Sequence, residues 1–99
     1  MSSPRFHPEA RQEFDETFAF LAERSPTAAV RFASRVTETL GLLTVFPDAG
    51  RPLFGPFRAV ALNPFSHDLV YRIDADGEVI IFAVAHHRRQ PGYWRDRTP

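Results

Sequence analysis

The residues best suited to chemistry gather in one stretch near the end of the sequence, Ala85–Arg97 (AHHRRQPGYWRDR). Histidine can accept or donate a proton near neutral pH, and an arginine side chain can bind a phosphate through two parallel hydrogen bonds. Cleavage of RNA needs a base, an acid and a cation that faces the developing negative charge. His86, Arg88 and Tyr93 therefore form a candidate catalytic group.

The same stretch also permits an interpretation without catalysis. It would be a surface turn whose arginines form ion pairs and whose aromatic residues anchor the tail against the core. The arginines would be Arg88 or Arg89, their partners Asp68 or Asp96, and the anchors Tyr93 and Trp94.

The sequence does not indicate a metal site. Successive residues of a strand point to opposite faces, so His86 and His87 would not form a chelating pair if the strand continues that far. The chain has no Cys, and no third ligand is evident. We expect neither a metal ion nor another cofactor.

Length and composition limit the size and class of the protein that carries these residues. A chain of 99 residues that is 43% hydrophobic is long enough for one core, so we expect a single domain over residues 1–99. The absence of Cys fits a reducing cytoplasm, and no segment has the length and apolar character of a signal peptide or a membrane span. The formal net charge is zero and all twelve basic residues are Arg, which excludes any chemistry that needs a lysine.

Two helices precede the candidate residues. Pro8 suits a first helical turn, and the apolar residues that follow at spacings of three and four predict a helix over Pro8–Arg24. Its other face carries an acidic run, including Glu13, which we interpret as a solvated surface. Ser25–Pro26 repeats the start signal, and a second helix is expected to run to about Phe46.

The rest of the chain predicts strands. Three runs of apolar and β-branched residues are separated by turns, and a short first strand is also possible at Arg5–His7. The three runs are Phe57–Leu62, His67–Asp74, and Glu78 to about His87. The predicted fold is α+β, with an N-terminal antiparallel helical hairpin packed on one face of a small, mainly antiparallel β-sheet. The other face would be offered to solvent, substrate or a partner.

The order of these elements resembles the RelE/ParE toxin family from end to end. The segments that carry the resemblance are PEA at 8–10, FPDAGRP at 46–52, LVYRI at 69–73 and VAHHRR at 84–89. The resemblance implies a bacterial toxin held inactive by a cognate antitoxin. RelE-like members cut mRNA on the ribosome, whereas ParE-like members poison DNA gyrase without a known catalytic group.

The sequence departs from the RelE-like nucleases at several positions. Ala59 and Ala61 stand where those nucleases have lysines, and Asp68 stands where they have an arginine, so that a carboxylate would repel the substrate phosphate. Only Arg88, with Tyr93 or Trp94, is retained.

These departures favour a non-enzymatic toxin that binds DNA gyrase. The expected target contacts are residue types common at binding hot spots: His87, Arg88, Arg89, Tyr93 and Trp94. The alternative is a ribosome-dependent mRNA endonuclease that uses His67, His86 or His87 as its base. A third possibility is a degenerate member that only binds its antitoxin. Phe20, Leu42 and Val45 lie off the main helical stripes, and we expect them to form an exposed apolar patch that the antitoxin covers.

Overall fold

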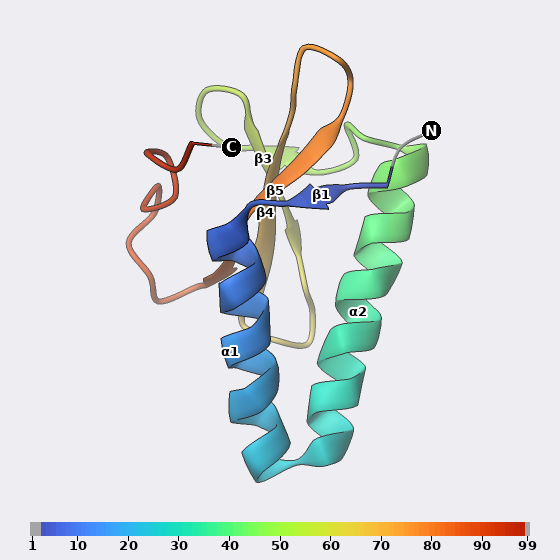
Figure 1. Cartoon of the computed structure of the whole chain (residues 1–99), viewed down its shortest axis with the longest axis vertical. Coiled ribbons are helices and arrows are strands. Elements are labelled where there is room, and N and C mark those ends of the chain that lie inside the picture. Colours follow the sequence, from blue (N-terminus) through green and yellow to red (C-terminus); the bar gives the residue numbers. More distant parts are fainter. Residues whose placement is uncertain (1–2, 99) are drawn as a thin grey trace.

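A computed structural model describes residues 3–98 of the chain. Two helices, α1 (Pro8–Arg24) and α2 (Pro26–Val45), form an antiparallel hairpin beside a five-stranded sheet (Figure 1). The predicted α+β fold is confirmed, and both predicted helices are correct to within one residue. No helix within residues 3–98 is long and apolar enough to cross a membrane.

Ser25 makes the sharp connection between the helices. Its backbone N–H donates to the carbonyl oxygen of Leu21 at 2.7 Å, which ends α1. Its hydroxyl accepts the backbone N–H of Ala28 at 3.2 Å, which satisfies a free donor in the first turn of α2. Pro26 occupies the first helical position, where no amide hydrogen is needed.

The sheet has the strand order β1-β5-β4-β3-β2. The strands are β1 (Arg5–Phe6), β2 (Arg51–Pro52), β3 (Phe57–Ala61), β4 (His67–Ile73) and β5 (Val79–His86). β1 runs parallel to β5, and all other neighbouring pairs are antiparallel. The strands expected from the sequence are confirmed to within one residue. β2 was not expected, because two residues carry no hydrophobic alternation.

The turn between α2 and β2 is fixed to the sheet by Tyr71, which is fully buried on β4. The Tyr71 hydroxyl donates to the Pro47 carbonyl oxygen at 2.7 Å and accepts the Gly50 N–H at 2.8 Å. A Cβ atom at Gly50 would lie 2.7 Å from that hydroxyl oxygen, so only glycine fits here. β2 is thereby held at the edge of the sheet.

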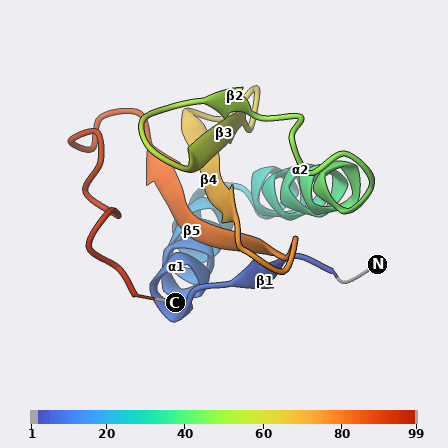
Figure 2. The ribbon, with the colours of Figure 1, turned by 90° about the horizontal axis from the view of Figure 1, so that it is seen from above.

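The two faces of the sheet carry separate cores. The helices cover the first, whose largest members include Phe32, Leu43 and Tyr71. The second core contains Phe57, Phe82 and Trp94, and the residues after β5 cover it (Figure 2). The face that we expected to be open is therefore partly closed by the chain itself. We call residues 87–98 the C-terminal strap.

Candidate functional site

β5 ends at His86, and the chain then turns away from the sheet. The Arg89 N–H donates to the His86 carbonyl oxygen at 2.9 Å, and the His87 N–H donates to the Ser66 carbonyl oxygen at 2.9 Å. Arg88 and Arg89 therefore lie in this turn, beyond the end of the strand. Both are exposed.

A pocket of about 470 Å³ opens between the second sheet face and the strap. We call it the sheet pocket. Its apolar walls are Leu53, Phe54, Val70, Ala85, Tyr93 and Trp94, and the rest of its lining includes Arg51, Asp68, His86, His87 and Arg89. This volume is within the range of small-ligand and side-chain sites. The pocket therefore combines an aromatic interior with a mainly basic polar lining.

Asp68 is the acidic group of this lining. Its carboxylate accepts a hydrogen bond from Arg51 at 2.8 Å and lies 3.0 Å from Nε2 of His87. Burial raises the pKa of Asp68, but the hydrogen bonds from Arg51 and His87 outweigh it and lower the pKa overall. The ion pairs expected between Asp68 and Arg88 or Arg89 are not found. Arg51 and His87 take their place.

Two histidines face each other across the last strand pair. His67 pairs with His86 in the register of β4 and β5, and their rings are 4.9 Å apart. Burial, and then the charges of His86 and His87, lower the pKa of His67 to about 4, so His67 is neutral at neutral pH. Nδ1 of His86 accepts the Arg88 N–H at 3.0 Å. A neutral His86 therefore carries its hydrogen on Nε2 and has no free basic nitrogen.

Tyr93 is held by a carboxylate. Its hydroxyl donates to Glu13 at 2.6 Å, and the Arg89 guanidinium stacks 3.8 Å above the centre of its ring. Burial, and then the hydrogen bond to Glu13, raise the pKa of Tyr93 well above its ordinary value. Release of this proton is therefore difficult. His86 and Tyr93 both line the sheet pocket, but the exposed Arg88 side chain lies outside its lining, so the predicted catalytic group is not assembled.

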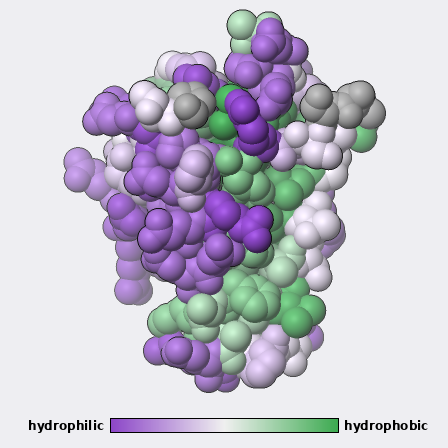
Figure 3. Space-filling view, viewed as in Figure 1, coloured by the Kyte–Doolittle hydropathy of each residue, from purple (hydrophilic) through white to green (hydrophobic). Residues whose placement is uncertain are grey.

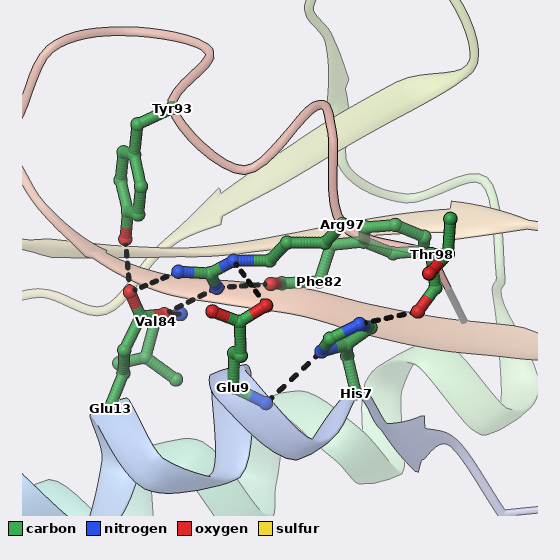
Figure 4. A network of polar contacts seen from close by, with 8 residues as sticks. All are labelled: His7, Glu9, Glu13, Phe82, Val84, Tyr93, Arg97 and Thr98. Atoms are coloured by element: carbon green, nitrogen blue, oxygen red, sulfur yellow. Dashed lines mark hydrogen bonds and ion pairs between the residues drawn. The ribbon is translucent and has the colours of Figure 1, made fainter.

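Glu13 stands at the centre of a polar network that joins α1, β5 and the strap (Figure 4). The interpretation of the α1 acidic face as a solvated surface is wrong for Glu13, whose side chain is only 15% exposed. Its partners Val84, Tyr93 and Arg97 lie far along the chain, so these contacts could not be predicted from local patterns. One signal was present: Glu13 follows the buried Ala10 by three residues and so borders the apolar stripe.

Trp94 belongs to the second core. Its side chain is 5% exposed, stacks against Phe54 with ring centres 5.9 Å apart, and meets Phe57 edge to face. This burial fits the interpretation of Trp94 as an anchor of the tail. Only the part that lines the sheet pocket remains for contact with a target, so Trp94 is a poor candidate for an exposed contact residue.

The residues expected to bind the antitoxin are exposed, as predicted. Phe20, Leu42 and Val45 have exposed fractions of 53%, 40% and 55%. They do not form one patch, because Phe20 lies near the joined ends of the helices and the other two near the far end of α2. Apolar surface nevertheless extends over the helical hairpin between these ends (Figure 3). A partner would have to follow the hairpin to cover all three.

No group of three or more His, Cys, Asp or Glu side chains within residues 3–98 is arranged to hold a metal ion. The groups that remain for interaction are the exposed arginines of the turn, the sheet pocket beside them and the apolar hairpin.

Comparisons with known proteins agree with this architecture. The family model described as the ParE toxin of the type II toxin–antitoxin system parDE matches residues 5–91. A solved structure described as the chromosomal ParDE toxin–antitoxin system from P. aeruginosa is similar to this chain, with a TM-score of 0.71 and 20% sequence identity. The similarity covers 87% of this chain and 96% of that chain. A search of curated proteins found no match.

Proposed function

The chain belongs to the ParE toxin family of type II toxin–antitoxin systems, and from this premise we propose that it inhibits bacterial growth by poisoning DNA gyrase. A cognate antitoxin would neutralise it in the cytoplasm. The observation that carries the proposal is the exposed turn after β5, where Arg88 and Arg89 extend beside an aromatic pocket. Arginine beside aromatic side chains is a common composition of protein-binding hot spots.

The state of the nearby titratable groups supports a binding role over a catalytic one. The Tyr93 hydroxyl donates to Glu13, and His86 has its Nδ1 engaged by a backbone N–H. His67 is a weak base, because its pKa is lowered to about 4. None of these three groups is therefore well placed to exchange protons with RNA, as the base or acid of a nuclease must.

One observation favours mRNA cleavage as the second candidate function. Nε2 of His87 lies 3.0 Å from the Asp68 carboxylate, which can only accept a hydrogen bond when it is ionised. His87 would then present its other nitrogen, Nδ1, as an oriented base, in the manner of catalytic histidine–carboxylate pairs. Arg51 and Arg89 line the same pocket and could bind phosphate.

The test is induction of the protein alone in a bacterial host, followed by measurement of chromosome cleavage and mRNA integrity in the same culture. Gyrase poisoning predicts cleaved chromosomes and a DNA-damage response before any loss of mRNA. Purified protein should also inhibit supercoiling by purified gyrase. Rapid mRNA loss with intact chromosomes would refute the gyrase proposal and establish the second candidate.

Point variants assign the effect to the proposed surface. Arg88→Ser and Arg89→Ser should each weaken gyrase inhibition. Arg31→Ser is the matched control, because Arg31 is exposed on α2 and makes no ion pair within the described residues. His87→Gln should weaken inhibition only in part under the gyrase proposal, because His87 is one of several expected contacts, and should abolish activity if His87 is the base of a nuclease.

A further inference from the structure

The strap lies over the second sheet face without joining the sheet. The His87 N–H, at the start of the strap, donates to the Ser66 carbonyl oxygen at 2.9 Å. Beyond His87 the backbone hydrogen bonds of the strap are local turns, such as those from Arg95 N–H to the Gly92 carbonyl and from Arg97 N–H to the Trp94 carbonyl, both 3.0 Å. Such turns shape the segment but do not attach it to the body of the protein. Side chains must therefore determine where the strap lies.

Beyond His87, four residues hold the rest of the strap against the body. Trp94 inserts into the second core, and the Thr98 carbonyl oxygen lies 2.6 Å from Nε2 of His7. Tyr93 and Arg97 both bind Glu13, at 2.6 Å for the phenol and at 3.0 and 2.9 Å for the two guanidinium nitrogens. Glu13 is thus the one side chain of α1 that receives hydrogen bonds from two strap residues.

The Glu13 carboxylate is fully used. It accepts the Val84 N–H at 3.0 Å in addition to the three bonds from the strap, so that its oxygens meet four donors. Arg97 is 11% exposed and also donates to the Phe82 carbonyl oxygen at 2.7 Å. Burial opposes the charge of Arg97, but the hydrogen bond and charge of Glu13 outweigh it and raise the pKa. A buried ion pair satisfied in this way fixes geometry, and removal of one partner leaves a costly buried charge.

The fixed strap determines the position of the exposed turn. Residues 87–92 run between the end of β5 and Tyr93, and Arg89 lies over the Tyr93 ring at 3.8 Å. If Tyr93 were released, Arg89 would lose the surface on which it stacks and the sheet pocket would lose one wall. The arrangement of the turn therefore depends on a carboxylate that α1 supplies.

We propose that Glu13 is a positioning residue, which orders the strap so that the Arg88–Arg89 turn is presented to the target in a single arrangement. The identity of that target rests on the proposed function, but the ordering does not. A binding surface that must be ordered at each encounter loses affinity in proportion to the fraction of time it spends disordered. Loss of Glu13 should therefore raise the concentration needed for inhibition and leave the maximal inhibition unchanged.

The variant Glu13→Gln tests this, because it removes the charge and keeps the size of the side chain. We expect the half-maximal inhibitory concentration in a supercoiling assay with purified gyrase and plasmid DNA to rise about tenfold, equivalent to about 1.4 kcal/mol of binding free energy. Complete inhibition should still be reached at high toxin concentration. Glu23→Gln is the control, because Glu23 is an exposed residue of the same helix and makes no ion pair within residues 3–98.

Amide hydrogen exchange separates positioning from general loss of stability. In Glu13→Gln, peptides from residues 87–98 should exchange at least tenfold faster, while peptides from β4 and the core of α2 change little. An inhibitory concentration within twofold of wild type would overturn the proposal, whether or not exchange in the strap increases. Weaker inhibition by Glu13→Gln would also overturn the proposal if hydrogen exchange became faster by the same factor throughout the protein. If Glu13→Gln does not fold, Arg97→Gln removes the other partner and is judged by the same two measurements.

Failure of the gyrase proposal would give a different result. In that case wild-type protein would not inhibit gyrase at all, and the two variants would be compared in mRNA cleavage by translating ribosomes. A rise in the concentration needed there, with faster exchange in the strap, would support the role of Glu13 with another target. Equal potency of wild type and variants would overturn it for that target as well.

Discussion

Tyr93→Phe distinguishes a structural hydroxyl from a catalytic one. The substitution removes a 2.6 Å hydrogen bond to Glu13 and leaves the aromatic ring in place. Hydrogen bonds to charged groups contribute about 1.5–3 kcal/mol. Glu13 keeps its bonds from Val84 and Arg97, so the carboxylate is not left unpaired. We therefore expect the lower end of that range, a loss of about 1.5 kcal/mol in the free energy of unfolding.

Urea unfolding and calorimetry measure this loss. For a domain of this size, about 1.5 kcal/mol corresponds to a decrease of roughly 6–12 °C in Tm. Inhibition should persist in Tyr93→Phe, with potency reduced by less than in Glu13→Gln. Tyr71→Phe is the matched control, since it removes a buried hydroxyl that makes two hydrogen bonds away from the strap. It should lose a similar amount of stability and keep full potency.

The reasoning would be refuted if Tyr93→Phe abolished activity while its unfolding free energy stayed within about 0.5 kcal/mol of wild type, the usual range for a neutral surface change. That result would mean that the hydroxyl transfers a proton in the reaction. Mass spectrometry of the mRNA fragments from wild type would then identify the cleaved bond.

Three further predictions concern the rest of the molecule. Gly50→Ala should destabilise the protein by about 2 kcal/mol or more, because its Cβ would lie 2.7 Å from the Tyr71 hydroxyl, and thermal unfolding measures this. The folded-state pKa of His67, about 4, lies below the ordinary histidine value of 6.5, so the unfolded chain binds the proton first as pH falls. Stability should therefore drop between pH 6.5 and 4 by about 1–2 kcal/mol after allowance for solvent screening, and this drop should be absent in His67→Gln. Antitoxin binding should slow hydrogen exchange around both Phe20 and Val45, and protection at only one end would contradict a partner that follows the whole hairpin.

Local rules were sufficient to predict the elements of the fold. The Ser25–Pro26 pair marks the junction of the helices because a capping hydroxyl and a residue without an amide hydrogen both suit a first turn. β5 was recognisable because Val79–Ala85 is apolar throughout, and every residue of that run is buried. These signals lie within a few residues of the feature that they predict.

The candidate site was harder to predict, because it depends on contacts between distant parts of the chain. Glu13 and Tyr93 are 80 positions apart, and the local sequence distinguishes Glu13 from the acids beside it only by its place at the border of the apolar stripe. The pairing of His67 with His86 follows from strand register, which a hairpin prediction without a fixed turn does not give. The sequence predicts which residues lie on one strand. It does not predict the distant side chains that contact them and set their protonation.

The formal net charge of the chain is zero, but the distribution of ion pairs decides where positive charge remains on the surface. Arg51 is neutralised by Asp68, and Arg97 by Glu13. By contrast, neither Arg88 nor Arg89 has a carboxylate within ion-pair distance in the described part of the chain. Positive charge is therefore left unpaired at the exposed turn after β5, while the acids that balance it in the total lie elsewhere. A neutral chain can in this way present a locally basic surface, and Glu13 contributes twice, by pairing one arginine and by holding the segment that carries the others.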